Sequence, residues 1–362
     1  MNHKGPLTVV LPTYNERENI TPLLREIIST DSRNAIKRIV VVDDDSPDQL
    51  PEYLKTKEFV KDVICIHRLN RDGLSSAVIE GFMIADTEYV AVMDSDGQHS
   101  ADDLIAMMEI ALEKDLDLVI GSRFLTNKSG GTHTGWRYQL SCFGNYIVNR
   151  VTGHEVSDPL TGFFVIRRTI MTSIAKTVKP HGFKILFDVL FALRNRQVRI
   201  EEYQIHFKSR RSGESKLDSG VILEFAEQVL SRVTRGLVPE RFLGFALVGG
   251  SGVFVHLIAL YLMHLQFGND FLPSHVVATL VAMIWNYSAN NAITFRRFRR
   301  MGLKWFSGLI YFCIISSIGA IANVGVAGLL NANEFIWWAS ALAGVVVGTV
   351  FNFALARFFV WR

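Results

Sequence analysis

The sequence predicts an α/β domain with a parallel sheet, followed by an all-α membrane domain. In residues 1–125, apolar runs rich in β-branched residues alternate with amphipathic stretches, as in a sheet that helices cover on both faces. Charge then almost disappears, because residues 242–362 hold nine of the 73 charged residues. We expect a soluble domain over 1–216, an amphipathic juxtamembrane helix over 217–241 and a membrane domain over 242–362.

Short apolar runs locate the strands and amphipathic stretches locate the helices between them. Strands are expected at 7–11, 36–42, 63–67, 89–93 and 117–120. Helices are expected at 17–28, 50–59, 74–85 and 101–114.

Composition narrows the class of protein. A net charge of +3 over 362 residues is too small to indicate a nucleic-acid partner. The three cysteines are far apart and lack zinc or redox spacing, so we expect inert thiols in a reducing compartment. The N-terminal apolar run is too short for a signal peptide, and the soluble domain is therefore expected in the cytoplasm.

The stretch YVAVMDSDGQHS, residues 89–100, carries the strongest chemical signal. A buried strand ends in Asp94 and Asp96, at the edge where open α/β sheets bind ligands. Alternation along an extended chain would point Asp94, Asp96 and Gln98 the same way. Hard oxygen ligands suit Mg²⁺ or Mn²⁺, and such ions commonly bind substrate phosphates as well. The alternative is a solvated turn.

Acidic residues also follow the first two expected strands, in PTYNE at 12–16 and DDDSPD at 43–48. Carboxylates there can accept hydrogen bonds from a nucleotide base or ribose. Glu16 fits this role and a helix-capping role equally well. For Asp44 we favour ligand contact, since three adjacent acids repel one another unless donors or a cation lie nearby.

Isolated cations beside glycines mark the second half of the soluble domain. Such cations are usually solvated, but a set of them after an acidic metal site would neutralise two phosphorylated substrates. The cations are Arg123, Arg137, Lys184 and one of the neighbours Arg210 and Arg211.

With these motifs assembled, the chain resembles family 2 glycosyltransferases of the Rossmann-like GT-A fold. Within them it is similar to the dolichyl-phosphate mannose synthase group of polyprenyl-phosphate sugar transferases. The matching segments, between residues 6 and 217, are PTYNERENI, VVVDDDSPD, GLSSAVIEGF, VMDSDGQH, GSRF, DPLTGFF, GFKIL and RRSGESKL. The Gln-x-x-Arg-Trp motif of processive synthases is absent, which favours a single sugar transfer.

The resemblance implies a role for each candidate residue. The nucleotide sugar would contact Pro12, Tyr14, Glu16, Val42, Asp44, Asp94 and Asp96. A Mg²⁺ or Mn²⁺ ion would bind Asp94, Asp96 and Gln98. The substrate phosphates would contact Arg123, Arg137, Lys184 and Arg210 or Arg211, which the alignment does not separate. Asp188 stands where a Glu is common, and this departure removes no proposed ligand.

The implied reaction inverts the anomeric centre. A cation stabilises the leaving diphosphate, and the acceptor phosphate monoester is already anionic, so it needs positioning more than a base. Asp96 and Arg123 are the catalytic candidates with Asp158. Asp158 fits a base, an orienting residue or a loop acid bonded to backbone.

Four apolar segments of the membrane domain, near 242–267, 272–295, 305–330 and 335–360, are long enough to span a bilayer. The connection between the second and third carries five cations, and the other two carry none. The positive-inside rule then places both termini in the cytoplasm. The amphipathic stretch 217–237 fits a bilayer surface or packing against the catalytic domain.

Residues 286–296 align with 352–362 at a constant offset of 66, which indicates an internal repeat of helix pairs. The region resembles the GtrA-like four-helix membrane family. Asn286, Asn290, Asn291 and Asn352 are expected to bond between helices, and a lipid-phosphate role is the alternative.

Taken together, these features predict a membrane-anchored, metal-dependent transferase of one hexose to a dolichyl or other polyprenyl phosphate. GDP-mannose is the favoured donor, and UDP-glucose or another UDP-hexose is the second choice. A rival of another class is a lipid-handling or translocating membrane protein with a non-catalytic sugar-nucleotide domain. The membrane domain also leaves room for a homo-oligomer.

Overall fold

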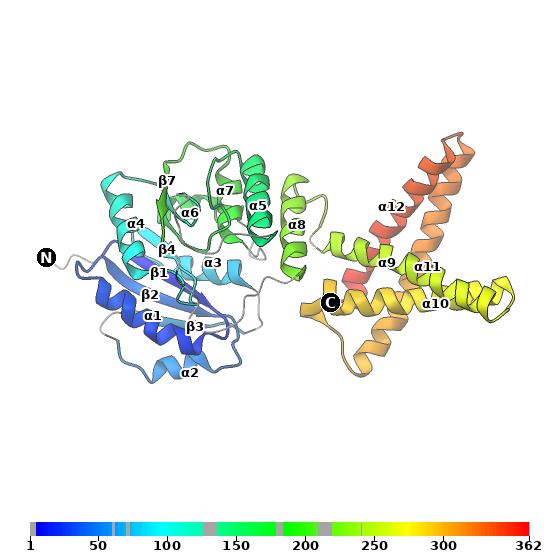
Figure 1. The fold of residues 1–362 in the computed structure, drawn as a ribbon, viewed down its shortest axis with the longest axis horizontal. Helices are drawn as coiled ribbons and strands as arrows, with labels where there is room; N and C mark the ends of the chain where they lie inside the picture. The colour runs from blue at the N-terminus through cyan, green and yellow to red at the C-terminus, as the bar shows by residue number, and fades with distance from the viewer. Residues whose placement is uncertain are drawn as a thin grey trace. The chain divides into compact units, whose positions relative to one another are not determined.

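A computed structural model describes residues 5–59, 62–69, 73–125, 136–178, 184–206, 208, 219–239 and 241–361. The chain forms two compact units, Met1–Lys216 and Leu217–Arg362. Figure 1 draws the first from blue to green and the second from yellow-green to red.

The first unit is a seven-stranded sheet covered by helices. Its strands are β1 (Leu7–Thr13), β2 (Ile36–Asp43), β3 (Asp62–His67), β4 (Tyr89–Val92), β5 (Leu118–Ser122), β6 (Phe164–Arg167) and β7 (Ile200–Gln204). Its helices are α1 (Arg17–Thr30), α2 (Leu50–Lys55), α3 (Leu74–Ile84), α4 (Ala101–Glu113), α5 (Trp136–Thr152), α6 (Arg168–Ile174) and α7 (Ile185–Leu193).

All five expected strands and all four expected helices are present. Expected and observed ends differ by a few residues, and most for α2, which ends at Lys55 where the pattern predicted residue 59. Phe59 still packs against the apolar core from the loop after the helix, which explains why its apolar character extended the predicted helix.

The five expected strands run parallel to one another, as predicted, but the whole sheet is mixed, which corrects the expectation of a purely parallel sheet. The strand order is β3-β2-β1-β4-β6-β5-β7. The short strand β6, which the sequence pattern did not predict, lies antiparallel between β4 and β5. It therefore separates two strands that are consecutive in the chain.

Apolar side chains alternate between the two faces of the sheet and form two cores. One core joins α1, α2 and α4 to one face, and the other joins α3, α6 and α7 to the opposite face. Val9 and Val10 show the alternation, since each is fully buried in a different core. This double cover explains the nearly continuous apolar strands.

The second unit is helical (Figure 1). It contains α8 (Ser219–Val233), α9 (Phe242–Leu260), α10 (Phe271–Ala289), α11 (Leu303–Ala332) and α12 (Trp337–Leu355). Three π-helical turns, η1 (Tyr261–Gln266), η2 (Asn290–Thr294) and η4 (Ala356–Val360), extend α9, α10 and α12, and a 3₁₀ turn, η3 (Arg296–Phe298), follows η2. α9 packs on α10, and α11 packs on α12.

Three described stretches are long and apolar enough to cross a membrane, namely Phe242–Gln266, Leu303–Ala332 and Leu342–Val360. The expected second span corresponds to α10 and η2, where His275 and three asparagines lower the apolar content. The four-helix count therefore stays a prediction. α8 packs on α9, where Glu227 Oε1 accepts a hydrogen bond from Gly244 N at 2.8 Å.

The internal repeat is visible in the backbone. The turns η2 and η4 begin and end at residues that are 66 apart, as in the sequence alignment. Phe295 N and Trp361 N close the two turns by bonding to Asn290 O and Ala356 O. The Phe295 and Trp361 rings stack on each other with centroids 4.2 Å apart and planes 5° apart.

The asparagines of the repeat behave differently from one another. Asn291 bonds between segments, since its Oδ1 accepts from Trp361 Nε1 at 3.0 Å. Asn290 Nδ2 donates to Asn286 O within its own helix. Interhelical bonding is therefore confirmed for Asn291 only among the bonds described here.

Candidate active site

The sheet topology gathers five loops at one edge. β1, β2 and β4 are parallel, so the segments after Thr13, Asp43 and Val92 leave the sheet on the same side. β6 runs the other way, and its first residue, Phe164, pairs with Val92 and with Ile120 of β5. The segment before β6 therefore reaches the edge at which the acidic stretch and the Arg123 loop begin.

Asp94 lies beside a histidine and a glycine. His99 Nε2 is 3.6 Å from Asp94 Oδ2, and the His99 ring packs on Phe163 with centroids 4.6 Å apart. A Cβ atom at Gly162 would overlap the Asp94 carboxylate oxygens, so only glycine leaves room for this carboxylate. Histidine and glycine together fix where Asp94 points.

The Asp94 carboxyl is held in its charged form. Burial alone would raise its pKa. The adjacent His99 ring and the nearby cations Lys184 and Arg123 outweigh that effect, so the pKa lies below its ordinary value. An ionised carboxylate is the form that a divalent cation requires.

Asp96 and Gln98 follow in a tight turn that Gly97 permits with a φ of +76°. Asp96 is buried, and its Oδ1 accepts a hydrogen bond from Gln98 N at 3.1 Å. Gln98 Nε2 donates to Lys208 O at 3.3 Å, and Lys208 N donates to Gln98 O at 2.9 Å. The amide nitrogen of Gln98 thus faces Lys208, which leaves its Oε1 as the ligand atom.

These side chains fit a hard divalent cation only as part of a larger ligand set. Within the described part of the chain, no three His, Cys, Asp or Glu side chains are grouped closely enough to hold a metal. Two carboxylates and one amide would need oxygens from water or a substrate diphosphate to complete an octahedral shell. Such a set is typical of Mg²⁺ or Mn²⁺ sites that bind with substrate.

Arg123 and Asp158 form a paired unit across the edge. Arg123 Nε and Nη2 donate to Asp158 Oδ2 and Oδ1 at 2.7 and 3.0 Å, and Arg123 N donates to Oδ2 at 3.2 Å. The Asp158 side chain is fully buried, whereas Arg123 keeps 28% of its side chain exposed. Asp158 therefore orients a guanidinium that still reaches the surface, and this geometry favours the orienting role over the base.

Lys184 adds a second cation. It directly precedes α7, and burial holds the pKa of its ammonium below the ordinary value, although Asp94 opposes that shift and Arg123 adds to it. The electrostatic interactions of Lys184 with Asp94, Arg123 and Asp158 show that these four groups share one cluster. The cluster can bind anionic groups next to the acidic stretch.

The residues predicted to hold a nucleotide lie at the ends of β1 and β2. Pro12 is buried, and its carbonyl accepts from Ser95 Oγ at 2.9 Å. Val42 is fully buried in β2, and its carbonyl accepts a hydrogen bond from Thr13 Oγ1 at 3.2 Å. Tyr14 is partly exposed in the loop that follows β1.

Glu16 is the N-cap residue of α1 but makes no side-chain capping bond. Its Oε2 accepts from Asn19 Nδ2 at 2.7 Å. The capping alternative for Glu16 is therefore not what the structure shows.

Asp44 has an internal role that the sequence did not predict. Its Oδ1 accepts from Arg68 Nη1 at 3.0 Å and its Oδ2 from Gly73 N at 2.9 Å. Arg68 is buried and also donates to Ser76 Oγ at 2.7 Å. Asp44 thus joins β2 to the start of α3, whether or not it also touches a ligand.

Three predicted phosphate contacts are not tested by this geometry. Arg137 lies in α5, and its side chain is not among those described. Arg210 and Arg211 lie outside the described residues.

Sequence reasoning missed several polar residues at this edge, namely Arg68, His99, Ser122, Ser157 and Glu202. Ser122 and Ser157 stand next to Arg123 and Asp158 in the motifs GSRF and SDPLTG, so adjacency was the available signal. Glu202 had no signal, because acidic residues in an edge strand are ordinarily solvated.

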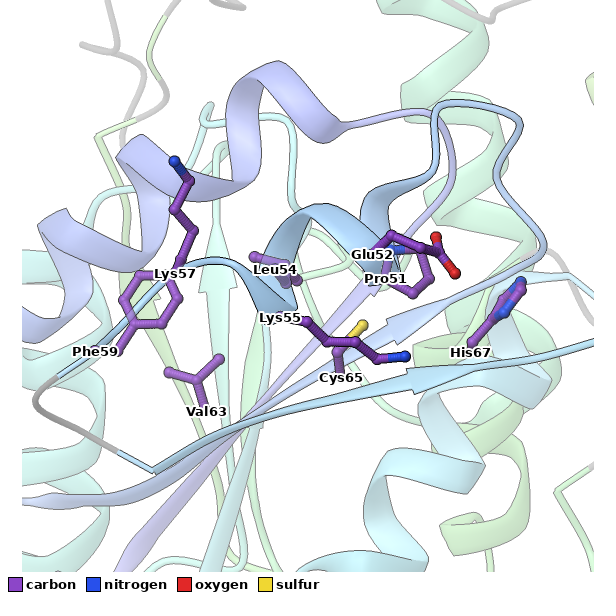
Figure 2. A pocket seen from close by; sticks show the side chains of 9 residues that line it. All are labelled: Pro51, Glu52, Leu54, Lys55, Lys57, Phe59, Val63, Cys65 and His67. Atoms are coloured by element: carbon purple, nitrogen blue, oxygen red, sulfur yellow. The ribbon is translucent and has the colours of Figure 1, made fainter.

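A separate pocket of about 230 Å³ lies between α2 and β3, and it shares no lining residue with this cluster. Figure 2 shows Lys55 and Glu52 from α2 and Cys65 and His67 from β3 along it. Burial raises the pKa of the Cys65 thiol to about 12. The pocket therefore offers no reactive thiol.

Comparisons with known proteins match both units. The model of glycosyl transferase family 2 matches residues 8–174, and the GtrA/DPMS transmembrane domain matches residues 244–361. The dolichol-phosphate mannosyltransferase of Pyrococcus furiosus is 31% identical over 367 residues, which cover 98% of this chain and 99% of that protein. The undecaprenyl-phosphate mannosyltransferase of Micrococcus luteus is 31% identical over 247 residues, or 65% of this chain and 95% of that protein.

A solved structure confirms the fold of the first unit. Glucosyl-3-phosphoglycerate synthase from Mycobacterium tuberculosis, in complex with Mn²⁺, UDP and phosphoglyceric acid, aligns with a TM-score of 0.50. The two sequences are 18% identical, and the alignment covers 65% of this chain and 80% of that one. This comparison concerns the fold alone.

Proposed function

Because this chain belongs to glycosyl transferase family 2 and carries a GtrA/DPMS transmembrane domain, we propose that it transfers one mannose from GDP-mannose to a polyprenyl phosphate. The chain is a glycosyltransferase. Both relatives described above are named as mannosyltransferases that act on a polyprenyl phosphate. Their shared sugar and acceptor class support the proposal.

The observation that carries the proposal is the juxtaposition of ionised Asp94 with Arg123 and Lys184. A transfer between two phosphorylated substrates needs a cation site for the leaving diphosphate and further cations for the acceptor. Asp94, Asp96 and Gln98 supply oxygen ligands, and the two basic side chains supply the rest. A membrane domain gives the chain access to a lipid acceptor.

Each residue has a defined task in the proposed reaction. Asp94, Asp96 and Gln98 would hold Mg²⁺ or Mn²⁺, which neutralises charge on the leaving diphosphate when bound. Arg123 binds a substrate phosphate while Asp158 keeps its guanidinium oriented. Lys184 contributes a desolvated positive charge beside Asp94. The acceptor oxygen is anionic before it attacks, so no side chain has to remove a proton, and attack opposite the leaving group inverts the anomeric centre.

The first test is transfer of label from a panel of nucleotide sugars into organic-extractable lipid, with membranes that contain the full chain and polyprenyl phosphate. We expect label from GDP-mannose, with loss of incorporation in EDTA and recovery with Mg²⁺ or Mn²⁺. Asp96→Asn should lose activity because it removes an anionic ligand. Asp102→Asn, at an exposed position in the first turn of α4, is the matched control and should retain activity.

Other outcomes contradict parts of the proposal. Label from a UDP-hexose instead would overturn the donor. Absence of label from every donor, with acceptor present, would favour a lipid-handling protein. Activity that persists in EDTA would show that the reaction does not require a divalent metal ion.

A further inference from the structure

A chain of hydrogen bonds runs behind the Arg123–Asp158 pair and begins at Glu202 on β7. Glu202 Oε1 accepts from Ser157 Oγ at 2.7 Å and from Ser157 N at 2.8 Å. Ser157 Oγ and Ser122 Oγ share a short hydrogen bond. Ser122 Oγ accepts from Phe124 N at 3.1 Å.

The chemistry of the end groups sets the direction of every bond. The Glu202 carboxylate only accepts, so the Ser157 hydroxyl donates its proton to Glu202. Ser157 then has only lone pairs to offer Ser122, whose hydroxyl must donate to Ser157 Oγ. Phe124 N–H donates at the far end. The chain is thus ordered from a backbone amide beside Arg123 to an acidic side chain, and bonds aligned in this way strengthen one another.

This chain ties together the two loops that carry the ion pair. Ser122 directly precedes Arg123, and Ser157 directly precedes Asp158. Ser157 is held on its other side as well, since its carbonyl accepts from Asn145 Nδ2 at 2.8 Å. Register supports the arrangement, because Glu202 pairs with Ile120 on the neighbouring strand β5.

The link matters most when a substrate is bound. A phosphate that engages Arg123 shares the guanidinium with Asp158, which weakens the ion pair. The Glu202–Ser157–Ser122 chain does not use the Arg123 side chain, so it persists in the bound state. It can keep the two loops in register while Arg123 contacts both Asp158 and the phosphate.

We propose that Glu202 is a positioning residue, which acts through Ser157 and Ser122 to hold Arg123 where it meets a substrate phosphate. This inference rests on the proposed function, and specifically on phosphate binding by Arg123. Glu202 itself touches no substrate. Its removal would take away the carboxylate that accepts from Ser157 N and from the Ser157 hydroxyl, and would loosen one link between the two loops.

The experiment compares Glu202→Ala and Glu202→Gln in the full-length protein. Alanine removes the acceptor, and we expect kcat/KM to fall about tenfold through a higher KM, because positioning and not bond-making chemistry is lost. Glutamine retains an acceptor oxygen and should restore kcat/KM to within about threefold of wild type. Glu201→Ala is the matched control, since Glu201 is the preceding residue on β7 and pairs with Lys114 at 2.6 Å. It should behave as wild type.

A double-mutant cycle tests the route. If Glu202 acts through Ser122, then Ser122→Ala combined with Glu202→Ala should be no worse than the poorer single variant. If the two substitutions instead lower kcat/KM by the product of their separate effects, Glu202 does not act through Ser122. Wild-type kinetics in Glu202→Ala, or no rescue by glutamine, would overturn the proposal.

A binding readout separates this proposal from the transfer reaction. Inorganic pyrophosphate with Mn²⁺ probes the phosphate site regardless of base, sugar or lipid. We expect Glu202→Ala to weaken its calorimetric affinity, with Glu201→Ala unchanged. Weaker binding without any mannosyl transfer by wild type would refute the proposed function and support the positioning role. Equal binding by both variants and wild type, or no binding by wild type, would refute the positioning role.

Discussion

At the scale of single residues, Asp158 shows how a buried carboxylate is used. Its two oxygens make three bonds to Arg123, and no part of its side chain is exposed. A general base needs a lone pair directed at the substrate proton. Asp158 directs its oxygens at a guanidinium instead.

Asp158→Asn therefore separates an orienting role from a basic one. We expect kcat/KM to fall, because the neutral amide holds Arg123 less firmly, while the pH profile of kcat/KM keeps its shape. If Asp158 were the base, the variant would lose the acidic limb of that profile. The profile is measured with purified full-length protein and saturating metal.

Gly162 is a second residue whose effect is local. A methyl group there would overlap the Asp94 carboxylate. Gly162→Ala should displace this ligand and lower transfer by about a hundredfold, as misplacement by about 1 Å can do. Manganese titration should show weaker binding, and the midpoint of heat unfolding shows whether the fold survives. Unchanged manganese affinity would contradict the assignment of Asp94 as a ligand.

Cys65 provides a prediction of pH dependence. Its pKa of about 12 means that roughly one thiol in 10⁴ is ionised at pH 8. Because the thiolate is the reactive form, iodoacetamide should modify Cys65 at pH 8 roughly a thousandfold more slowly than a free thiol. Its modification rate should rise about tenfold for each unit by which the pH is increased, up to about pH 12. Cys142, exposed on α5, is the internal reference in peptide mass analysis. Rapid modification of Cys65 at pH 8 would contradict the burial.

At the scale of elements, the short strand β6 determines which loop reaches the edge of the sheet that carries Asp94 and Arg123. Its four residues pair antiparallel with both β4 and β5. Because it enters the sheet from the carboxyl edge, it brings Asp158 and Gly162 to the strand ends that carry Asp94 and Arg123. A parallel strand in the same place would have delivered that loop to the opposite edge.

Each helix pair of the second unit contains a close contact between a glycine and an asparagine. A Cβ at Gly252 would overlap the Asn286 side chain, and a Cβ at Gly319 would overlap that of Asn352. Among the described residues, the Oδ1 atoms of Asn286 and Asn352 accept no hydrogen bond. Close approach of small residues is a usual way to pack helices in membranes.

Gly252→Ala and Gly319→Ala should each destabilise the second unit by about 1–3 kcal/mol through overpacking. Gly249→Ala in the same helix is the matched control, since a Cβ there meets nothing within 4 Å. The measurement is the midpoint of thermal unfolding in detergent. Unfolding of this unit is monitored by hydrogen exchange of the backbone amides in α9 to α12. Equal midpoints for Gly252→Ala and Gly249→Ala would contradict the contact.

At the scale of the whole molecule, the proposed reaction joins a soluble donor to a lipid acceptor, and the second unit holds the described stretches that are long and apolar enough to cross a membrane. The positive-inside rule supports a cytoplasmic first unit, and four spans would return the C-terminus to that side. Single cysteines in a background without native cysteines test this arrangement. We expect an impermeant maleimide to label Asn269→Cys and Asn333→Cys from outside intact cells.

Arg299→Cys, in the basic connection, should be labelled only after lysis. Equal labelling of Asn269→Cys and Arg299→Cys in intact cells would show that α10 does not span the bilayer. Wild-type transfer activity in each variant ensures that the labelled molecules are folded.

The sequence alone determined the strand and helix pattern of residues 7–114, the acidic stretch after the fourth strand and the apolar second unit. It did so because the alternation of apolar residues, and the residues that end a buried strand, are local properties of the chain. Only the tertiary structure decided that β6 separates β4 from β5, that Asp158 forms an ion pair with Arg123 and that Glu202 accepts a hydrogen bond from Ser157. These depend on pairings between segments far apart in the chain, and neither a four-residue strand nor an acid in an edge strand carries a periodic signal. Strand order and side-chain partners arise from packing of the whole sheet. The residue types of the site could therefore be predicted from the sequence, whereas their arrangement in space could not.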